Sequence, residues 1–216
     1  MPVYWNPTEI EKRSFAIITE QLGDKPLKEE NAEVIKRVIH TTADFDYADN
    51  LLFSEHAVQK GIAALKSGCA IVTDTEMARA GINKSALERL GGQVYCFMSN
   101  PDVAAEAKER GVTRAVVSME RAARLTGAVM FAIGNAPTAL LRLGELLEAG
   151  SVSPALVIAV PVGFVNVVES KERILRSGVE RGVPCIVARG RKGGSSVAAA
   201  VCNALLYQSV RRETGD

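Results

Sequence analysis

Residues 128–160 have the sequence AVMFAIGNAPTALLRLGELLEAGSVSPALVIAV, and this stretch decides the fold class. It begins with one apolar run, Ala128–Ile133, and ends with another, Ala155–Val160. Between them, Thr138–Ala149 carries leucines at helical spacing and is followed by Gly150, a helix stop signal. Two buried strands joined by a helix predict a right-handed β-α-β unit with parallel strands.

The same pattern continues on both sides of this stretch. Further apolar runs occur at Cys69–Thr73, Gln93–Met98 and Pro184–Ala188. All five runs are short and rich in Val and Ile, and they show no clean alternation, which is typical of strands covered on both faces. We therefore predict an α/β fold with a doubly wound, mainly parallel five-stranded sheet and helices on both faces.

Helix signals separate these strands. Asn100-Pro101 begins one predicted helix, which ends at Gly111; another spans Asn166–Ser177 and ends at Gly178. The last predicted helix runs from Ser195 to about Arg211.

The N-terminal part, residues 1–67, is predicted to be mostly helical. Asn6-Pro7-Thr8-Glu9 resembles a capping box, and Gly23 ends that helix. Two more helices are expected at Glu29–His40 and Ser54–Ser67. No linker or repeat separates this part from the βα repeat part, residues 68–216, so we expect a single domain over residues 1–216.

Composition excludes several classes of protein. Of 216 residues, 47% are hydrophobic, 26 are Lys or Arg and 25 are Asp or Glu, giving a net charge of +1. This balance does not favour nucleic acid or an anionic membrane as partner. The apolar run Ala155–Val165 is too short to cross a bilayer, and the N-terminus lacks the pattern of a signal peptide, so we expect a cytoplasmic protein. The cysteines (Cys69, Cys96, Cys185 and Cys202) form no C-x-x-C pair and are expected to be small buried hydrophobic residues.

Unusual residues follow each predicted strand. Ligands of open α/β sheets bind beyond the carboxyl ends of the strands, so we expect these turns to converge on one cavity. The alternative is that Gly, Asn and Pro serve only the turns themselves. The turns are Thr73-Asp74-Thr75, Ser99-Asn100-Pro101, Gly134-Asn135-Ala136-Pro137-Thr138, Pro161-Val162-Gly163-Phe164 and residues 189–196, RGRKGGSS.

The last of these turns is the most informative. Arg189, Arg191 and Lys192 precede Gly193-Gly194 and the start of a helix. Guanidinium groups beside a helix N-terminus favour anionic oxygens, carboxylates as well as phosphates. Neither a Walker loop nor a dinucleotide fingerprint is present.

The predicted helix Glu29–His40 carries a candidate acid. Its apolar stripe is formed by Val34, Ile35, Val38 and Ile39, and Arg37 and His40 lie together on the opposite face. Taken alone, a surface histidine beside an arginine is more often simply solvated than part of a site. His56 receives no role. Metal-ligand spacing and a Gly-x-Ser-x-Gly elbow are absent from the sequence.

Taken together, these motifs resemble the precorrin-8X methylmutase family. The resemblance rests on residues 38–44 (VIHTTAD), 134–140 (GNAPTAL), 161–165 (PVGFV) and 189–195 (RGRKGGS), with Arg13-Ser14-Phe15 and the turn Thr73-Asp74-Thr75. It implies an isomerase of corrin biosynthesis that moves a methyl group from C-11 to C-12 of precorrin-8X or its cobalt form. It also implies a homodimer.

The family's catalytic histidine falls on His40, and its substrate-contacting serine and arginine fall on Ser14 and Arg37. We expect the strand-end turns to supply the remaining substrate contacts: Thr73, Asp74, Thr75, Gly134, Asn135, Gly163, Phe164, Arg189, Arg191, Lys192 and Gly193. A methyl shift within one molecule needs no cofactor from the protein, and a histidine can donate a proton near neutral pH.

Two other functions remain open at this point. A corrinoid or tetrapyrrole carrier would share the cationic turn without needing His40. A sugar-phosphate enzyme of similar fold would use the Gly-Gly-Ser-Ser helix start to hold phosphate.

Overall fold

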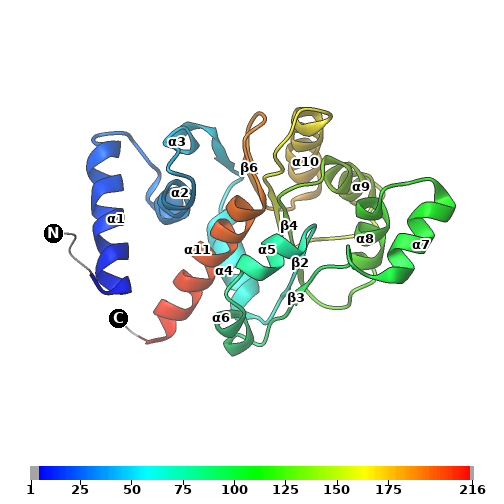
Figure 1. Ribbon diagram of the computed structural model, residues 1–216, viewed down its shortest axis with the longest axis horizontal. Coiled ribbons are helices and arrows are strands. Elements are labelled where there is room, and N and C mark those ends of the chain that lie inside the picture. The colour runs from blue at the N-terminus through cyan, green and yellow to red at the C-terminus, as the bar shows by residue number, and fades with distance from the viewer. Residues whose placement is uncertain (1–4, 215–216) are drawn as a thin grey trace.

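The computed structural model describes residues 5–214, with side chains described as far as Arg211. Its strands form one six-stranded sheet in the order β1-β6-β5-β4-β2-β3 (Figure 1). The strands are β1 (Leu51–Phe53), β2 (Ala70–Thr73), β3 (Val94–Tyr95), β4 (Val129–Ile133), β5 (Leu156–Ala159) and β6 (Cys185–Ala188). Every neighbouring pair is parallel except β1 with β6, which confirms a mainly parallel α/β sheet.

Helices cover both faces of this sheet. In Figure 1, α4, α5, α6 and α11 lie on one side, α8, α9 and α10 lie on the other, and α1 forms an outer layer beside α2. The helices are α1 (Pro7–Leu22), α2 (Glu29–Thr42), α3 (Tyr47–Asn50), α4 (Ala57–Lys66), α5 (Glu76–Gly81), α6 (Lys84–Arg89), α7 (Pro101–Arg110), α8 (Arg114–Ala122), α9 (Pro137–Glu148), α10 (Val167–Arg181) and α11 (Ser195–Thr214).

Two details of the sequence prediction are wrong. The described sheet has six strands rather than five, because Leu51–Phe53 adds an antiparallel edge strand of only three residues, too short to show a period. Helix α10 also continues through Gly178 to Arg181. A side chain on Gly178 would lie 2.6 Å from the Cys185 sulfur, so this glycine permits close packing instead of ending the helix.

Successive strand residues pack into two separate cores. Ile71 and Met130 contribute to the core under α2, α4 and α11, whereas Val72 and Phe131 contribute to the core under α8 and α9. All four side chains are at most 2% exposed. This two-sided burial explains why the strands show no alternation of polar and apolar residues in the sequence.

The strand order defines where a ligand site is expected. The chain passes from β2 to β3 on one side and then to β4 on the other, which makes the gap between β2 and β4 a topological switch point. The turns that begin at residues 73 and 134 flank this gap.

The remaining sequence expectations concern the cysteines and the membrane. All four cysteines are buried and free, and burial raises the pKa of Cys69, Cys185 and Cys202 to about 12. Buried thiols of this kind behave as small apolar side chains. Within residues 5–214, no helix is both long enough and apolar enough to cross a membrane.

Candidate functional site

His40 lies in the last turn of α2 with its side chain exposed. The four predicted stripe residues of α2 are buried, which confirms that His40 lies off the apolar stripe. Its ring stacks on Phe15 of α1, with centroids 5.4 Å apart and planes 27° apart. No hydrogen bond from the described residues occupies the ring nitrogens, so the imidazole can donate to a ligand.

Arg37, one turn before His40, is held between two helices. Its guanidinium pairs with Glu11 of α1 at 2.6 Å, and the arginine side chain is only 14% exposed. The guanidinium carbon lies 4.7 Å from the ring centre of Phe15 and 5.2 Å from that of Tyr207 in α11. Aromatic rings and a carboxylate therefore fix the orientation of this cation.

Ser14 approaches His40 from α1. Its hydroxyl donates to the carbonyl of Ile10 at 2.8 Å, which leaves its lone pairs as acceptors for a ligand. Ser14 and His40 line the same cavity of about 310 Å³. The three residues that the family resemblance assigned are thus brought together around Phe15.

A second cavity, of about 270 Å³, lies on the other side of His40. It brings the end of α2 next to the first half of α11 and the end of α5. Its lining residues are Arg37, His40, Thr41, Gly81, Ser196, Ala199, Ala200, Asn203 and Tyr207. His40 therefore lies at the boundary of two hollows and can reach a ligand in either.

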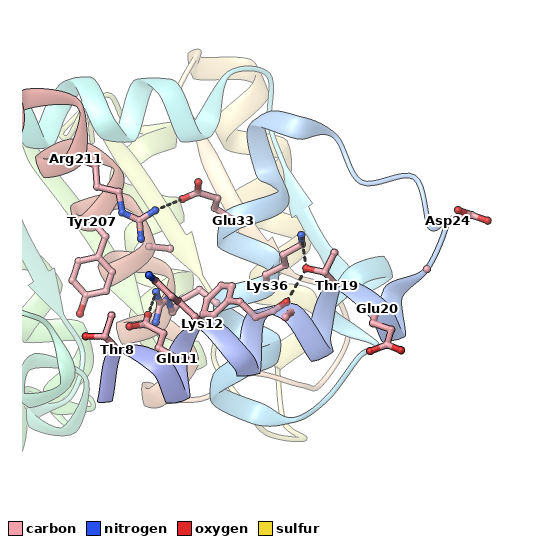
Figure 2. Close-up of a pocket in the computed structure, with 15 residues that line it drawn as sticks. Thr8, Glu11, Lys12, Thr19, Glu20, Asp24, Glu33, Lys36, Tyr207 and Arg211 are labelled. Atoms are coloured by element: carbon pink, nitrogen blue, oxygen red, sulfur yellow. Dashed lines mark hydrogen bonds and ion pairs between the residues drawn. The ribbon is translucent and has the colours of Figure 1, made fainter. Parts of the chain in front are cut away.

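The largest described cavity, about 1010 Å³, lies between α1, α2 and α11 and also includes Arg37 (Figure 2). Figure 2 shows Arg211 turned toward Glu33, 3.7 Å away, and Lys36 toward Thr19, 2.9 Å away. The sequence analysis missed this cavity. Its wall combines residues far apart in the chain, and its charges are mixed, so no charge pattern in the sequence marked it.

The turn after β2 supports its neighbour instead of facing a ligand. Asp74 is fully buried, and its carboxylate accepts backbone hydrogen bonds from Gly134, Asn135 and Ala136 at 2.8, 2.8 and 2.5 Å. Burial raises the pKa of this carboxyl, and the three amide bonds act in the opposite direction. Thr73 is also fully buried and donates to backbone carbonyls. The expectation that Thr73 and Asp74 touch substrate is therefore corrected, because neither side chain is accessible.

Direct contacts join the other turns at this edge of the sheet. Thr75 and Ser195 share a hydrogen bond of 2.8 Å. A side chain on Gly134 would lie 2.8 Å from the Gly194 carbonyl oxygen, so these two turns need glycine in order to approach. Asn135 is exposed and lies next to this junction.

The cationic turn contacts the turn after β5. Gly163 donates its amide to the Arg191 carbonyl at 3.3 Å, and the Arg191 guanidinium lies 5.6 Å from the Phe164 ring centre. Phe164 is 83% exposed, and Arg189 and Arg191 are both exposed. These two arginines are placed to meet an anionic ligand.

Lys192 is already paired. Its ammonium lies 2.6 Å from Asp44 and 2.6 Å from Asp46, both in the segment that follows α2. These hydrogen bonds raise the pKa of Lys192, and the same bond lowers the pKa of Asp44. Of the three cations expected to bind ligand, Lys192 is the one that already has protein partners: it pairs with two carboxylates and ties the cationic turn to the end of the His40 helix.

Four of the five predicted turns contact one another, but they do not line a common cavity among those described, so the predicted single cavity is not found. Ser99-Asn100-Pro101 begins α7, and no described hydrogen bond or ion pair in residues 5–214 joins it to the others. The cavities beside His40 are lined mainly by helices rather than by the turns. The turns contact one another closely at the switch point, and the described cavities next to His40 lie beside α2 instead.

Among the described residues, no group of three His, Cys, Asp or Glu side chains is arranged to hold a metal ion. The site instead offers an exposed imidazole, an oriented arginine and a serine hydroxyl, with two exposed arginines on a neighbouring turn. Such a set can donate a proton and bind carboxylates.

Comparison with known proteins gives a consistent result. The family model for precorrin-8X methylmutase matches residues 9–208. The cobalt-precorrin-8 methylmutase of Salmonella typhimurium is 45% identical, over 93% of this chain and 95% of that protein. The precorrin-8X methylmutase of Pseudomonas aeruginosa is 42% identical, over 91% of this chain and 93% of that protein.

A solved structure agrees with these relatives. The crystal structure of precorrin-8X methyl mutase from Thermus thermophilus is 37% identical and superposes with a TM-score of 0.83. The match covers 94% of this chain and 98% of that one. With the motifs and the fold already described, these matches show that the chain belongs to the precorrin-8X methylmutase family.

Proposed function

We propose that this protein is an isomerase of cobalamin biosynthesis that moves a methyl group from C-11 to C-12 of precorrin-8X or cobalt-precorrin-8. The product is hydrogenobyrinate or cobyrinate. The observation that carries this proposal is the placement of His40, exposed between two cavities, stacked on Phe15 and flanked by Arg37 and Ser14. Membership of the family supports the same reaction.

His40 is the proposed general acid. The migration occurs within one molecule, so the protein needs to place a proton on the macrocycle and hold the ring still. Donation by a positioned histidine contributes about 10²–10⁴-fold in rate. Arg37 holds a substrate oxygen beside it, Ser14 accepts a hydrogen bond from the substrate with its free lone pairs, and the Phe15 stack limits rotation of the imidazole.

The peripheral acetate and propionate groups of the macrocycle explain the cationic turn. We assign Arg189 and Arg191 to these carboxylates because both side chains are exposed on that turn. Thr75, Asn135, Gly163, Phe164 and Gly193 form the surface on which the ring rests, and Gly134 is buried beneath it, where it lets the turns approach. Lys192, Asp74 and Thr73 hold this surface in place from behind or from its edge.

The proposed assembly is a cytoplasmic homodimer. Three apolar side chains of the turn between β5 and α10 support it: Val162 is 47%, Phe164 83% and Val165 77% exposed. Contiguous exposed apolar residues favour a protein interface. A second copy placed there would also close the site from the open side.

The proposal is tested by incubating the enzyme with precorrin-8X or cobalt-precorrin-8 and following the spectral change on conversion. His40→Ala should lose about 10²–10⁴-fold in kcat and should still bind product, because the carboxylate contacts lie elsewhere. His56→Ala is the matched control, since His56 is 62% exposed and pairs only with nearby glutamates. Wild-type turnover by His40→Ala would remove His40 as the acid. Binding without any turnover by the wild-type protein would favour a carrier.

A further inference from the structure

Lys171 in α10 is a buried cation that the proposed reaction does not use. The residue is 1% exposed, and its ammonium donates to the carbonyl oxygens of Gly190 at 2.8 Å and Lys192 at 2.9 Å. No carboxylate among the described side chains pairs with it, and burial lowers its pKa to about 8. Burying an ammonium without a counter-charge is unfavourable, so packing alone does not explain this lysine.

The two carbonyl groups lie on either side of Arg191. Gly190 has a positive φ of 74°, and two more glycines follow Lys192, so the turn has little conformational restraint of its own. An ammonium with fixed donors to two carbonyls restrains this backbone from inside the molecule. Arg191 itself is exposed, and none of the described carboxylates forms an ion pair with it. The Phe164 ring, 5.6 Å from the guanidinium carbon, is a contact on one side of it, and the position from which the side chain starts is set by the backbone that Lys171 holds.

We propose that Lys171 is a positioning residue for ligand binding, which fixes the backbone on both sides of Arg191 and so directs the Arg191 guanidinium toward a carboxylate of the macrocycle. This inference rests on the proposed role of Arg191 in binding carboxylates. Lys171 stays out of contact with the ligand and acts through the turn.

Replacing Lys171 with Met separates positioning from stability. Met has a similar length and removes the buried charge, and replacing a buried charge with an apolar side chain is often neutral for folding. The carbonyls of Gly190 and Lys192 can turn to water, since the turn is at the surface. We therefore expect a folded variant whose turn is loose.

The test is a double-mutant cycle on product affinity, measured by absorbance titration with hydrogenobyrinate. Arg191→Ala should weaken binding about tenfold, as expected for one charge-assisted hydrogen bond. Lys171→Met should weaken binding about three- to tenfold in the wild-type background. In the Arg191→Ala background it should have almost no further effect, because the side chain that it positions is gone.

Ser170→Ala is the matched control. Ser170 is buried next to Lys171 but donates within α10, to the Val167 carbonyl, so its loss should leave affinity unchanged. Lys171→Gln, which keeps a donor, should give an intermediate affinity and serves if the Met variant does not fold. Equal weakening by Lys171→Met in both backgrounds would show a general structural effect and overturn the proposal. If Lys171→Met binds product as tightly as wild type while Arg191→Ala binds it more weakly, the positioning role of Lys171 is wrong and the role of Arg191 stands. If Arg191→Ala also binds product as tightly as wild type, the role of Arg191 in binding carboxylates is wrong as well.

Discussion

Two buried charges of opposite sign hold the turns that follow β4 and β6. Asp74 accepts three backbone amides of the first turn, and Lys171 donates to two carbonyls of the second. Each charged group satisfies backbone groups that no helix or strand pairs, which is the usual condition for burying a polar side chain. The accessible residues of these two turns, Asn135 and Arg191, are therefore carried on a backbone that is held from the buried side.

Gly193 belongs to the same support. A side chain there would lie 2.1 Å from the Val160 carbonyl oxygen and 2.7 Å from that of Pro161, so the two turns could not keep their present separation. We expect Gly193→Ala to lose about 1–3 kcal/mol more stability than Gly190→Ala, the range typical of overpacking. Gly190 is the control because it also has a positive φ but has nothing within 4 Å of the added carbon. Thermal unfolding of both variants measures the difference, and equal melting temperatures would contradict the crowding argument.

At the scale of elements, α9 and α10 are joined by a carboxylate at the end of α9. Glu148 accepts from Arg173 at 2.9 and 2.5 Å and from Ser177 at 2.9 Å. The bonds from Arg173 and then Ser177 lower the pKa of Glu148 to about 2, from an ordinary value of 4.5. The glutamate side chain is 38% exposed, so solvent and salt weaken the pair.

This shift predicts how stability depends on pH. Between pH 4.5 and about 2 the unfolded chain protonates Glu148 while the folded chain keeps it ionised. The stabilisation is therefore complete above pH 4.5 and is lost as pH falls toward 2. Urea unfolding of wild type and Glu148→Gln across this window should give curves that converge at the acid end. Glu109→Gln is the control, because Glu109 is exposed and has no described ion pair, and it should leave the pH dependence of the free energy of unfolding unchanged. A difference in free energy of unfolding between wild type and Glu148→Gln that stays constant across the window would contradict the assignment.

One element that the sequence analysis missed has little sequence signal of its own. β1 has only three residues, and its position is set by pairing with β6, so its strand character depends on a neighbour far along the chain. Gly178 was interpreted as a helix stop, but α10 passes through it because Cys185 of β6 packs against it. In both cases a contact with a residue far along the chain determined the secondary structure, where the local sequence pattern predicted something else.

For the whole molecule, the exposed apolar residues beside the site predict a dimer. The double variant Phe164→Asp, Val165→Asp should convert the protein from a dimer to a monomer, with the mass of one 23.1 kDa chain. The reason is that dimer formation would bury two carboxylates from each chain at the interface. Light scattering at several concentrations measures this. Val179→Asp is the control, since Val179 is also 77% exposed but lies near the other end of α10. A wild-type protein that is monomeric throughout would contradict the prediction.

The sequence by itself determined the α/β class, the parallel order of β-α-β units and the placement of His40 off the apolar stripe. These features follow from periodicity and helix signals, which are local properties of the chain. The tertiary structure alone decided that Asp74 and Lys192 pair with protein groups, and that α1, α2 and α11 enclose the largest described cavity. Whether a charged side chain meets a ligand or a distant backbone amide depends on which segments fold against each other. Residues 74 and 134, or 44 and 192, become neighbours only in the folded chain, and no local pattern records that distance.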